Sequence, residues 1–340
     1  MEGLASAVPK PSPEPFYTIR PHAGDVTSVE YLDIGTTGGL ASGTGSGQLS
    51  VWRLSDKRQM WTQSCPAGIT SVTRLGNTSD SLSVQLKGGV VTLWSIQTGK
   101  PGSSVTVENP SFCRISHFSS LVTTGQDSGG VFSSECFAVA DRNYGRVNMY
   151  DGKTRKLVQT LSAENVKSRG MCMCVRAWCD GSTGIPLVLA GFDDGSLLLW
   201  DVRRPSAEMT SLKLFPEPVM CLALDGEGRS GVCGSPGNSL EVFSLSPEKS
   251  VIGKRFGVEL KNPGVADVAV RGDCKIMASG GWDGRIRVFG WKKGKPLAIL
   301  NYHSSVVHCV SFAGRRAVSE DSNLMICGSK DSRISLWKLY

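Results

Sequence analysis

The sequence has few of the features on which enzymes and membrane proteins depend. Its apolar runs, such as Ile185–Ala190 and Leu197–Trp200, are far shorter than the ~20 residues that a membrane-spanning helix needs. The chain has four histidines and no GxSxG, Walker-type or HExxH motif. We therefore expect no catalytic residues, no bound cofactor and no membrane partner.

The first residues also lack the basic and apolar segments of a secretory signal. Four prolines, Pro9, Pro11, Pro13 and Pro15, would interrupt any helix there. The sequence thus predicts a cytoplasmic and/or nuclear protein with a disordered, proline-rich leader over residues 1–15.

Cysteine is abundant, but its spacing fits neither a disulfide framework nor a zinc site. The eleven cysteines are odd in number and form no CxxC pair, and no histidine lies near Cys172, Cys174 and Cys179. We expect buried thiols in a reducing compartment and no metal. The net charge of +7 is modest, and its short basic clusters lack the interleaved aromatics of a nucleic-acid platform, so nucleic acid is not expected as the partner.

What the sequence does contain is a repeat. A strand of small residues, a tight turn and an alternating strand that ends in an aromatic recur at intervals of 42 to 56 residues. The seven terminal aromatics are Trp52, Trp94, Tyr150, Trp200, Phe243, Phe289 and Trp337. Further alternating strands precede several of them, at Val26–Leu32, Pro218–Asp225, Gly264–Arg271 and Ser305–Ala313. Four short strands per repeat predict an all-β, seven-bladed propeller.

The repeats resemble the WD40 family. In that family, a histidine before the blade, a serine or threonine, an aspartate in the tight turn and the strand tryptophan form a hydrogen-bonded network. The last repeat matches this pattern with His303, Ser329, Asp331 and Trp337. Asp194 and Asp283 occupy the aspartate position in two other repeats, but no histidine serves them. Most blades are therefore expected to hold by packing and backbone pairing alone.

The two ends of the chain are expected to close the ring. The final repeat has only three strands of its own, and the β-prone segment Phe16–Arg20 is the natural fourth. An open row of blades would expose an unpaired edge. We therefore expect one propeller over residues 16–340, closed by an N-terminal strand in the last blade, with a Ser-rich insertion at about 103–136.

A closer resemblance covers residues 185–340 densely and the earlier part loosely. Leu189–Val202, Asn262–Trp291 and Gly328–Tyr340 resemble the guanine nucleotide-binding protein subunit beta-like protein 1 family, which includes the fungal ASTRA-associated protein. This resemblance implies a non-catalytic scaffold in the assembly and stability of phosphatidylinositol-3-kinase-like kinases, with Triple-T (ASTRA-type) co-chaperones as partners. The alternative is a scaffold in ribosome biogenesis or another nucleic-acid-associated complex. No G-protein γ chain is expected, because the leader has no heptad pattern. We expect a monomer within a larger complex.

In WD40 domains, the residue before the turn aspartate often lies on the partner-binding face. The candidate partner-binding residues here are Trp282, Lys330, Asp193, Asn143 and Lys87. An exposed aromatic is costly unless something covers it. Trp282 therefore either contacts a partner or packs across its own blade.

Overall fold

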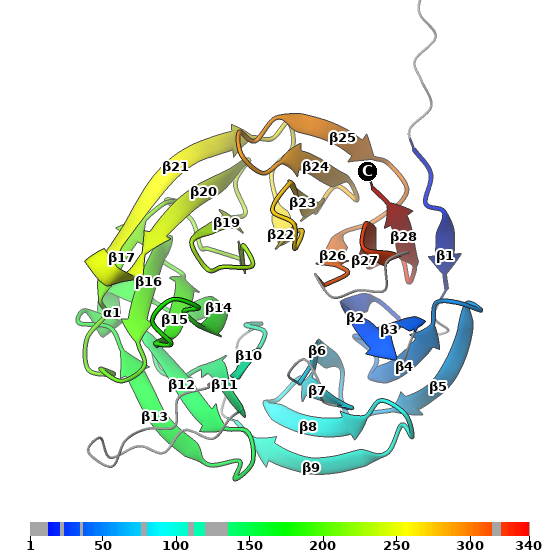
Figure 1. The fold of residues 1–340 in the computed structure, drawn as a ribbon, viewed down its shortest axis with the longest axis horizontal. Coiled ribbons are helices and arrows are strands. Elements are labelled where there is room, and N and C mark those ends of the chain that lie inside the picture. The colour runs from blue at the N-terminus through cyan, green and yellow to red at the C-terminus, as the bar shows by residue number, and fades with distance from the viewer. Residues whose placement is uncertain are drawn as a thin grey trace, which may run out of the picture.

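The computed structural model describes residues 13–20, 24–34, 37–75, 80–107, 112–119, 135–314 and 321–339. Within these residues, 28 strands form seven four-stranded antiparallel sheets. The sheets stand as blades around a central axis (Figure 1). The fold is thus the all-β, seven-bladed propeller that the repeat predicts. No helix in the described ranges is long and apolar enough to cross a membrane.

Blades 1 to 6 are each built from four consecutive strands, ordered from the central axis outward (Figure 1). Blade 1 contains β2 (Val26–Ile34), β3 (Thr37–Thr44), β4 (Gln48–Arg53) and β5 (Arg58–Ser64). Blade 2 contains β6 (Ile69–Arg74), β7 (Ser81–Leu86), β8 (Val90–Ser95) and β9 (Pro101–Thr106). Blade 3 contains β10 (Ser116–Ser119), β11 (Glu135–Ala140), β12 (Arg146–Asp151) and β13 (Leu157–Ser162).

The second half of the ring repeats this plan. Blade 4 contains β14 (Cys172–Cys179), β15 (Pro186–Phe192), β16 (Ser196–Asp201) and β17 (Thr210–Lys213). Blade 5 contains β18 (Cys221–Leu224), β19 (Ser230–Gly234), β20 (Ser239–Ser246) and β21 (Val251–Glu259). Blade 6 contains β22 (Val265–Val270), β23 (Ile276–Gly281), β24 (Ile286–Gly290) and β25 (Pro296–Leu300). Two single turns of helix, α1 (Val166–Arg169) and η1 (Pro247–Lys249), lie in loops.

Blade 7 joins the two ends of the chain. It contains β26 (Val307–Phe312), β27 (Leu324–Ser329) and β28 (Ile334–Lys338), and its outermost strand is β1 (Tyr17–Ile19). β1 pairs antiparallel with β28, with Thr18 opposite Ser335. In Figure 1 the blue β1 lies beside the red β28. The predicted closure by the N-terminal strand is therefore confirmed.

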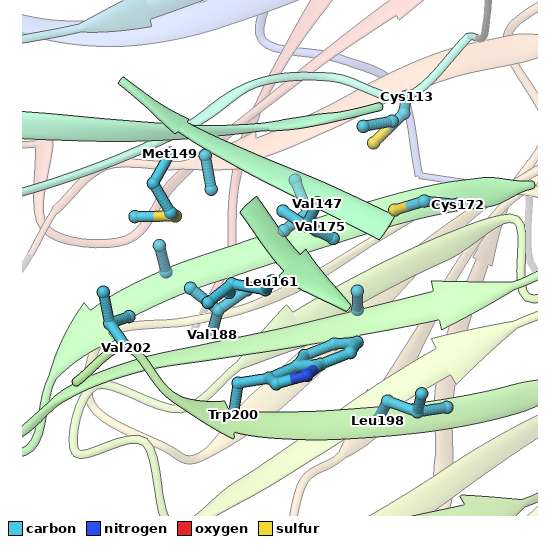
Figure 2. Close-up of a cluster of buried hydrophobic side chains, with 14 of the residues drawn as sticks. Cys113, Val147, Met149, Leu161, Cys172, Val175, Val188, Leu198, Trp200 and Val202 are labelled. Atoms are coloured by element: carbon cyan, nitrogen blue, oxygen red, sulfur yellow. The ribbon is translucent and has the colours of Figure 1, made fainter. Parts of the chain in front are cut away.

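The core lies between blades. All seven terminal aromatics are buried, and the described buried residues form seven hydrophobic clusters, each shared by two neighbouring blades. Figure 2 shows the cluster of blades 3 and 4, where Trp200 lies among side chains that include Val188 and Leu161. Because no blade covers its own faces, the ring gains this burial only when all blades are in place.

The tight turn between the second and third strands of a blade needs a positive φ, a backbone conformation that residues with a side chain rarely adopt. Gly195 has a φ of +84°, and a Cβ there would lie 2.0 Å from the carbonyl oxygen of Phe215. Gly284 has a φ of +77°, and its Cβ would lie 2.7 Å from the carbonyl oxygen of His303. Both glycines therefore let a turn approach the segment that leads into the next blade.

The eleven cysteines are free thiols, and eight of them are buried. This agrees with the prediction of buried thiols. Most of the predicted leader, residues 1–12, lies outside the described residues, as do 108–111 and 120–134 of the predicted insertion. The described part of that interval includes β10, the innermost strand of blade 3.

Candidate functional site

The five candidate partner-binding residues lie on one face of the ring. Each occupies the turn between the second and third strands of its blade, and each is exposed. We call this face, which carries Lys87, Asn143, Asp193, Trp282 and Lys330, the turn face. Because successive strands are antiparallel, the segments that enter the innermost strands reach the same face.

Backbone hydrogen bonds tie these turns to those entering segments. The amide of Lys87 donates to the carbonyl of Gly68 at 2.7 Å, and that of Lys330 donates to Val306 at 2.9 Å. Asp193 and Trp282 make the equivalent bonds to Met171 and Gly264, each at 3.0 Å. Asn143 differs, since its amide donates to the Asp141 carboxylate. The backbones of four of the five candidates are therefore held in the same way, which leaves their side chains free to project.

The sequence left two roles open for Trp282, contact with a partner or packing against its own blade, and the structure is compatible with both. Its ring lies over Gly264, where an added Cβ would come within 2.4 Å of the indole. The residue is nevertheless 46% exposed. Trp282 thus packs against the start of its own blade with one part of the ring and presents the rest on the turn face.

A pocket of about 450 Å³ opens on the turn face at the mouth of the central channel. Apolar side chains from five successive blades line it, among them Phe112, Met173, Met220, Trp282 and Val306. Arg114, Arg176, Asp267 and His308 add its polar groups. Of these residues, only Trp282 was predictable from the repeat, since the others come from entering segments and innermost strands.

Arg114 crosses the channel beneath this pocket. Its Nη1 lies 3.0 Å from Oδ2 of Asp267 in blade 6. Its Nη2 donates to the carbonyls of Thr27 in blade 1, at 3.1 Å, and of His308 in blade 7, at 2.7 Å. Arg114 itself enters blade 3, so a single guanidinium joins four blades.

The hydrogen-bonded network predicted for His303 is present in blade 7, but its serine is not the one that the repeat pattern indicates. Nδ1 of His303 lies 3.0 Å from Oδ2 of Asp331, and Nε2 lies 2.8 Å from Oγ of Ser335. Nε1 of Trp337 donates to the same Oγ at 2.8 Å. Burial lowers the pKa of His303, against the attraction of Asp331, so the ring is neutral at physiological pH. Since a carboxylate only accepts, Nδ1 carries the proton and Nε2 accepts from Ser335.

The expected network of His303, Ser329, Asp331 and Trp337 therefore needs a correction, because the serine that bonds His303 and Trp337 is Ser335. Ser329 ends β27, and its hydroxyl donates to the carbonyl of Ser305 and accepts from the amide of Asp331. Ser335 lies two residues before Trp337 on β28, so both side chains point to the same face of the strand. Ser329 holds the turn, and Ser335 completes the network.

The expectation that most blades hold by packing and backbone pairing alone does not extend to blades 4 and 6. In blade 4, Arg169 stands before the innermost strand and contacts Asp194 at 3.4 Å and Ser196 at 3.1 Å. In blade 6, Arg287 contacts Asp283 at 2.6 Å. Burial raises the pKa of Asp283, but the hydrogen bonds and charges of Arg287 and Arg285 together outweigh it, so the pKa lies below its usual value. In these two blades an arginine thus takes the place that histidine or serine has in the blade 7 network.

His22, the other histidine placed before a blade, lies outside the described residues. Within the described residues, no three His, Cys, Asp or Glu side chains gather in a group that could hold a metal ion. His117 lies in β10, and burial lowers its pKa to about 3. Its ring packs against Phe137, with 5.5 Å between ring centroids.

Comparison with known proteins agrees with this architecture. The family model described as "WD domain, G-beta repeat" matches residues 257–290 and 294–338. The chain is 34% identical over 348 residues to guanine nucleotide-binding protein subunit beta-like protein 1 of Mus musculus, and the match covers 99% of each chain. It is 24% identical to ASTRA-associated protein 1 of Schizosaccharomyces japonicus, over 96% of this chain and 99% of the relative.

The protein of the same name from Schizosaccharomyces pombe is 44% identical over 80 residues, which is 24% of this chain and 20% of the relative. WD40 propellers typically serve as non-catalytic scaffolds, and the closed ring with side chains gathered on one face fits that use. The full-length likeness to the mouse protein decides the family. The chain belongs to the guanine nucleotide-binding protein subunit beta-like protein 1 family of WD40 propellers.

Proposed function

We propose that this protein is a non-catalytic scaffold in the assembly and stability of phosphatidylinositol-3-kinase-like kinases, and that it binds co-chaperones of the Triple-T (ASTRA) type. The observation that carries the proposal is the likeness, over nearly the full length of both chains, to a protein named ASTRA-associated protein 1. We propose that it works in the cytoplasm and/or nucleus, as a monomer within a larger complex and without a G-protein γ chain.

The architecture supports a scaffold because the buried residues that make the ring rigid are different from the exposed residues that can contact a partner. Seven buried clusters and the Arg114 contacts fix the blades relative to one another. The side chains of the turn face project from short, hydrogen-bonded turns. A partner that docks there meets a preformed surface, so little conformational entropy is lost on binding. A few such side chains commonly supply most of the binding energy.

Affinity purification of the tagged full chain followed by mass spectrometry tests the proposal. We expect recovery of the kinases and their co-chaperones. We expect Trp282→Ala to remove them while the melting curve stays nearly unchanged. Leu297→Ala is the matched control, because Leu297 lies on the outermost strand of the same blade and is 51% exposed.

Salt separates this proposal from the nucleic-acid alternative. Nucleic-acid binding weakens steeply as salt rises, because bound counterions are released on association. Recovery of ribosomal precursors that are lost in moderate salt, without the kinases or co-chaperones, would contradict the proposed function.

A further inference from the structure

The pocket at the channel mouth carries an electrostatic imbalance. Arg114 and Asp267 neutralise each other across the channel. Burial lowers the pKa of His308, so its ring is neutral near pH 7. The guanidinium of Arg176 is therefore the charge of the pocket lining that no other lining group neutralises.

Arg176 has no strong partner in the described part of the chain. Its one hydrogen bond there runs from Nη1 to the carbonyl of Val175, at 3.4 Å, and no described carboxylate lies within ion-pair distance of it. Glu30 lies further along the channel, where burial raises its pKa to about 7, so that at neutral pH it is only partly ionised. A half-buried cation therefore lies at the inner end of the pocket without a dedicated counter-ion.

The walls above this cation are apolar and exposed. Trp282 is 46% exposed and Phe112 is 80% exposed, and Met173, Met220 and Val306 are half-buried between them. Aromatic residues, methionine and arginine are the types enriched where proteins bind one another. Methionine adapts its shape to the side chain that it receives. The pocket thus offers apolar contact at its mouth and one positive charge at its inner end.

From this arrangement we infer that the pocket binds an extended segment of a partner protein in which a bulky apolar side chain stands within two residues of an aspartate or glutamate. The apolar side chain fills the space between Trp282, Met220 and Met173, and the carboxylate pairs with Arg176. This inference deepens the proposed scaffold function and rests on it, because it gives the chemistry by which a partner is recognised.

The test uses a phage library of random heptapeptides panned on the full-length protein. We expect enriched peptides to contain a large apolar residue with an acidic residue one or two positions away. A synthetic, fluorescently labelled copy of the most enriched peptide is then titrated by fluorescence polarisation. Arg176→Gln and Trp282→Ala should each raise its Kd roughly tenfold or more.

Arg255→Gln is the matched control, because Arg255 is exposed on the outermost strand of blade 5, and it should leave the Kd unchanged. The melting curve of each variant reports whether it remains folded. A second variant, Met220→Ser, keeps the charge and should also weaken binding.

The inference is overturned if no peptide is enriched above the unselected library, or if enriched peptides lack acidic residues. It is also overturned if folded Arg176→Gln binds as tightly as the unmodified protein. None of these readings involves kinases or co-chaperones. Failure of this inference is therefore distinguishable from failure of the proposed function, which the mass-spectrometric recovery decides.

Discussion

Arg114 and Asp267 form an ion pair that joins opposite sides of the ring, with 3.0 Å between Nη1 and Oδ2. Asp267 is buried, and its Oδ2 also accepts the amide of Val310 at 2.9 Å. The pair therefore connects blade 3 with blades 6 and 7 through one carboxylate. Packing links each blade to its neighbours, whereas this pair reaches across the channel.

Arg114→Met should destabilise the fold strongly, because it leaves a buried carboxylate without its cation. We expect a loss of about 2–4 kcal/mol in the free energy of unfolding. Asp267→Asn alone should also destabilise, and the double variant should lose less than the sum of the two. Strictly additive losses in denaturant unfolding would show that the pair contributes no coupling.

Double-mutant cycles on the free energy of unfolding can identify the serine of the blade 7 network, because that serine should be energetically coupled to His303. Ser335→Ala should cost about 1–3 kcal/mol, since it leaves the buried indole N–H of Trp337 without an acceptor. In double-mutant cycles, His303→Ala should couple to Ser335→Ala and much less to Ser329→Ala. A stronger coupling to Ser329 would reinstate the serine that the repeat pattern predicts.

Ring closure depends on a strand of only three residues, and truncation tests it. Deleting residues 1–20 should lower the melting temperature by several degrees, because it removes buried Ile19, whose packing alone is worth about 2–4 kcal/mol. Deleting residues 1–12 is the control, because it leaves β1 intact. Equal melting temperatures for both truncated chains would contradict the closure.

His117 and Glu30, which both line the central channel, should make the stability of the fold depend on pH in opposite directions. The pKa of His117 falls from 6.5 to about 3 in the fold, through burial and then the charge of Arg155. Below about pH 6.5 the unfolded chain takes up a proton that the folded ring refuses, so this group lowers stability as the pH falls from 7 to 5. Burial raises the pKa of Glu30 from 4.5 to about 7, against the opposing effects of Arg74 and Arg176. Glu30 therefore raises stability over the same interval.

The measurement is the free energy of unfolding at several pH values between 5 and 7. His117→Phe should reduce the loss of stability toward pH 5, and Glu30→Gln should increase it, each by at most about 1.4 kcal/mol per pH unit. Parallel pH profiles for the two variants and the unmodified protein would show that neither group titrates differently in the fold.

The architecture was predictable because it is periodic. The recurring aromatics marked each blade, and the β-prone residues Phe16–Arg20 marked the strand that closes the ring. Both signals are local in sequence, and the packing of one blade against the next follows from them. Alternation along β28 could also have identified Ser335, since it lies on the same face as Trp337.

The contacts that cross the ring were not predictable in this way. Arg114 and Asp267 are 153 residues apart, and nothing in the repeat pattern pairs them. The arginines that serve Asp194 and Asp283 come from different places, one before its blade and one on the strand itself. The pocket of the turn face unites residues from five blades, of which only Trp282 stands out within its own repeat.

We propose that this protein maintains phosphatidylinositol-3-kinase-like kinases through partners bound at the turn face. The most direct measurement is the steady-state amount of these kinases, by quantitative mass spectrometry, in cells that lack the protein and in cells given it back. We expect the kinases to decline while their transcripts do not, and to recover with the unmodified protein or Leu297→Ala but not with Trp282→Ala. Kinase amounts that stay constant without the protein would rule out the proposed function.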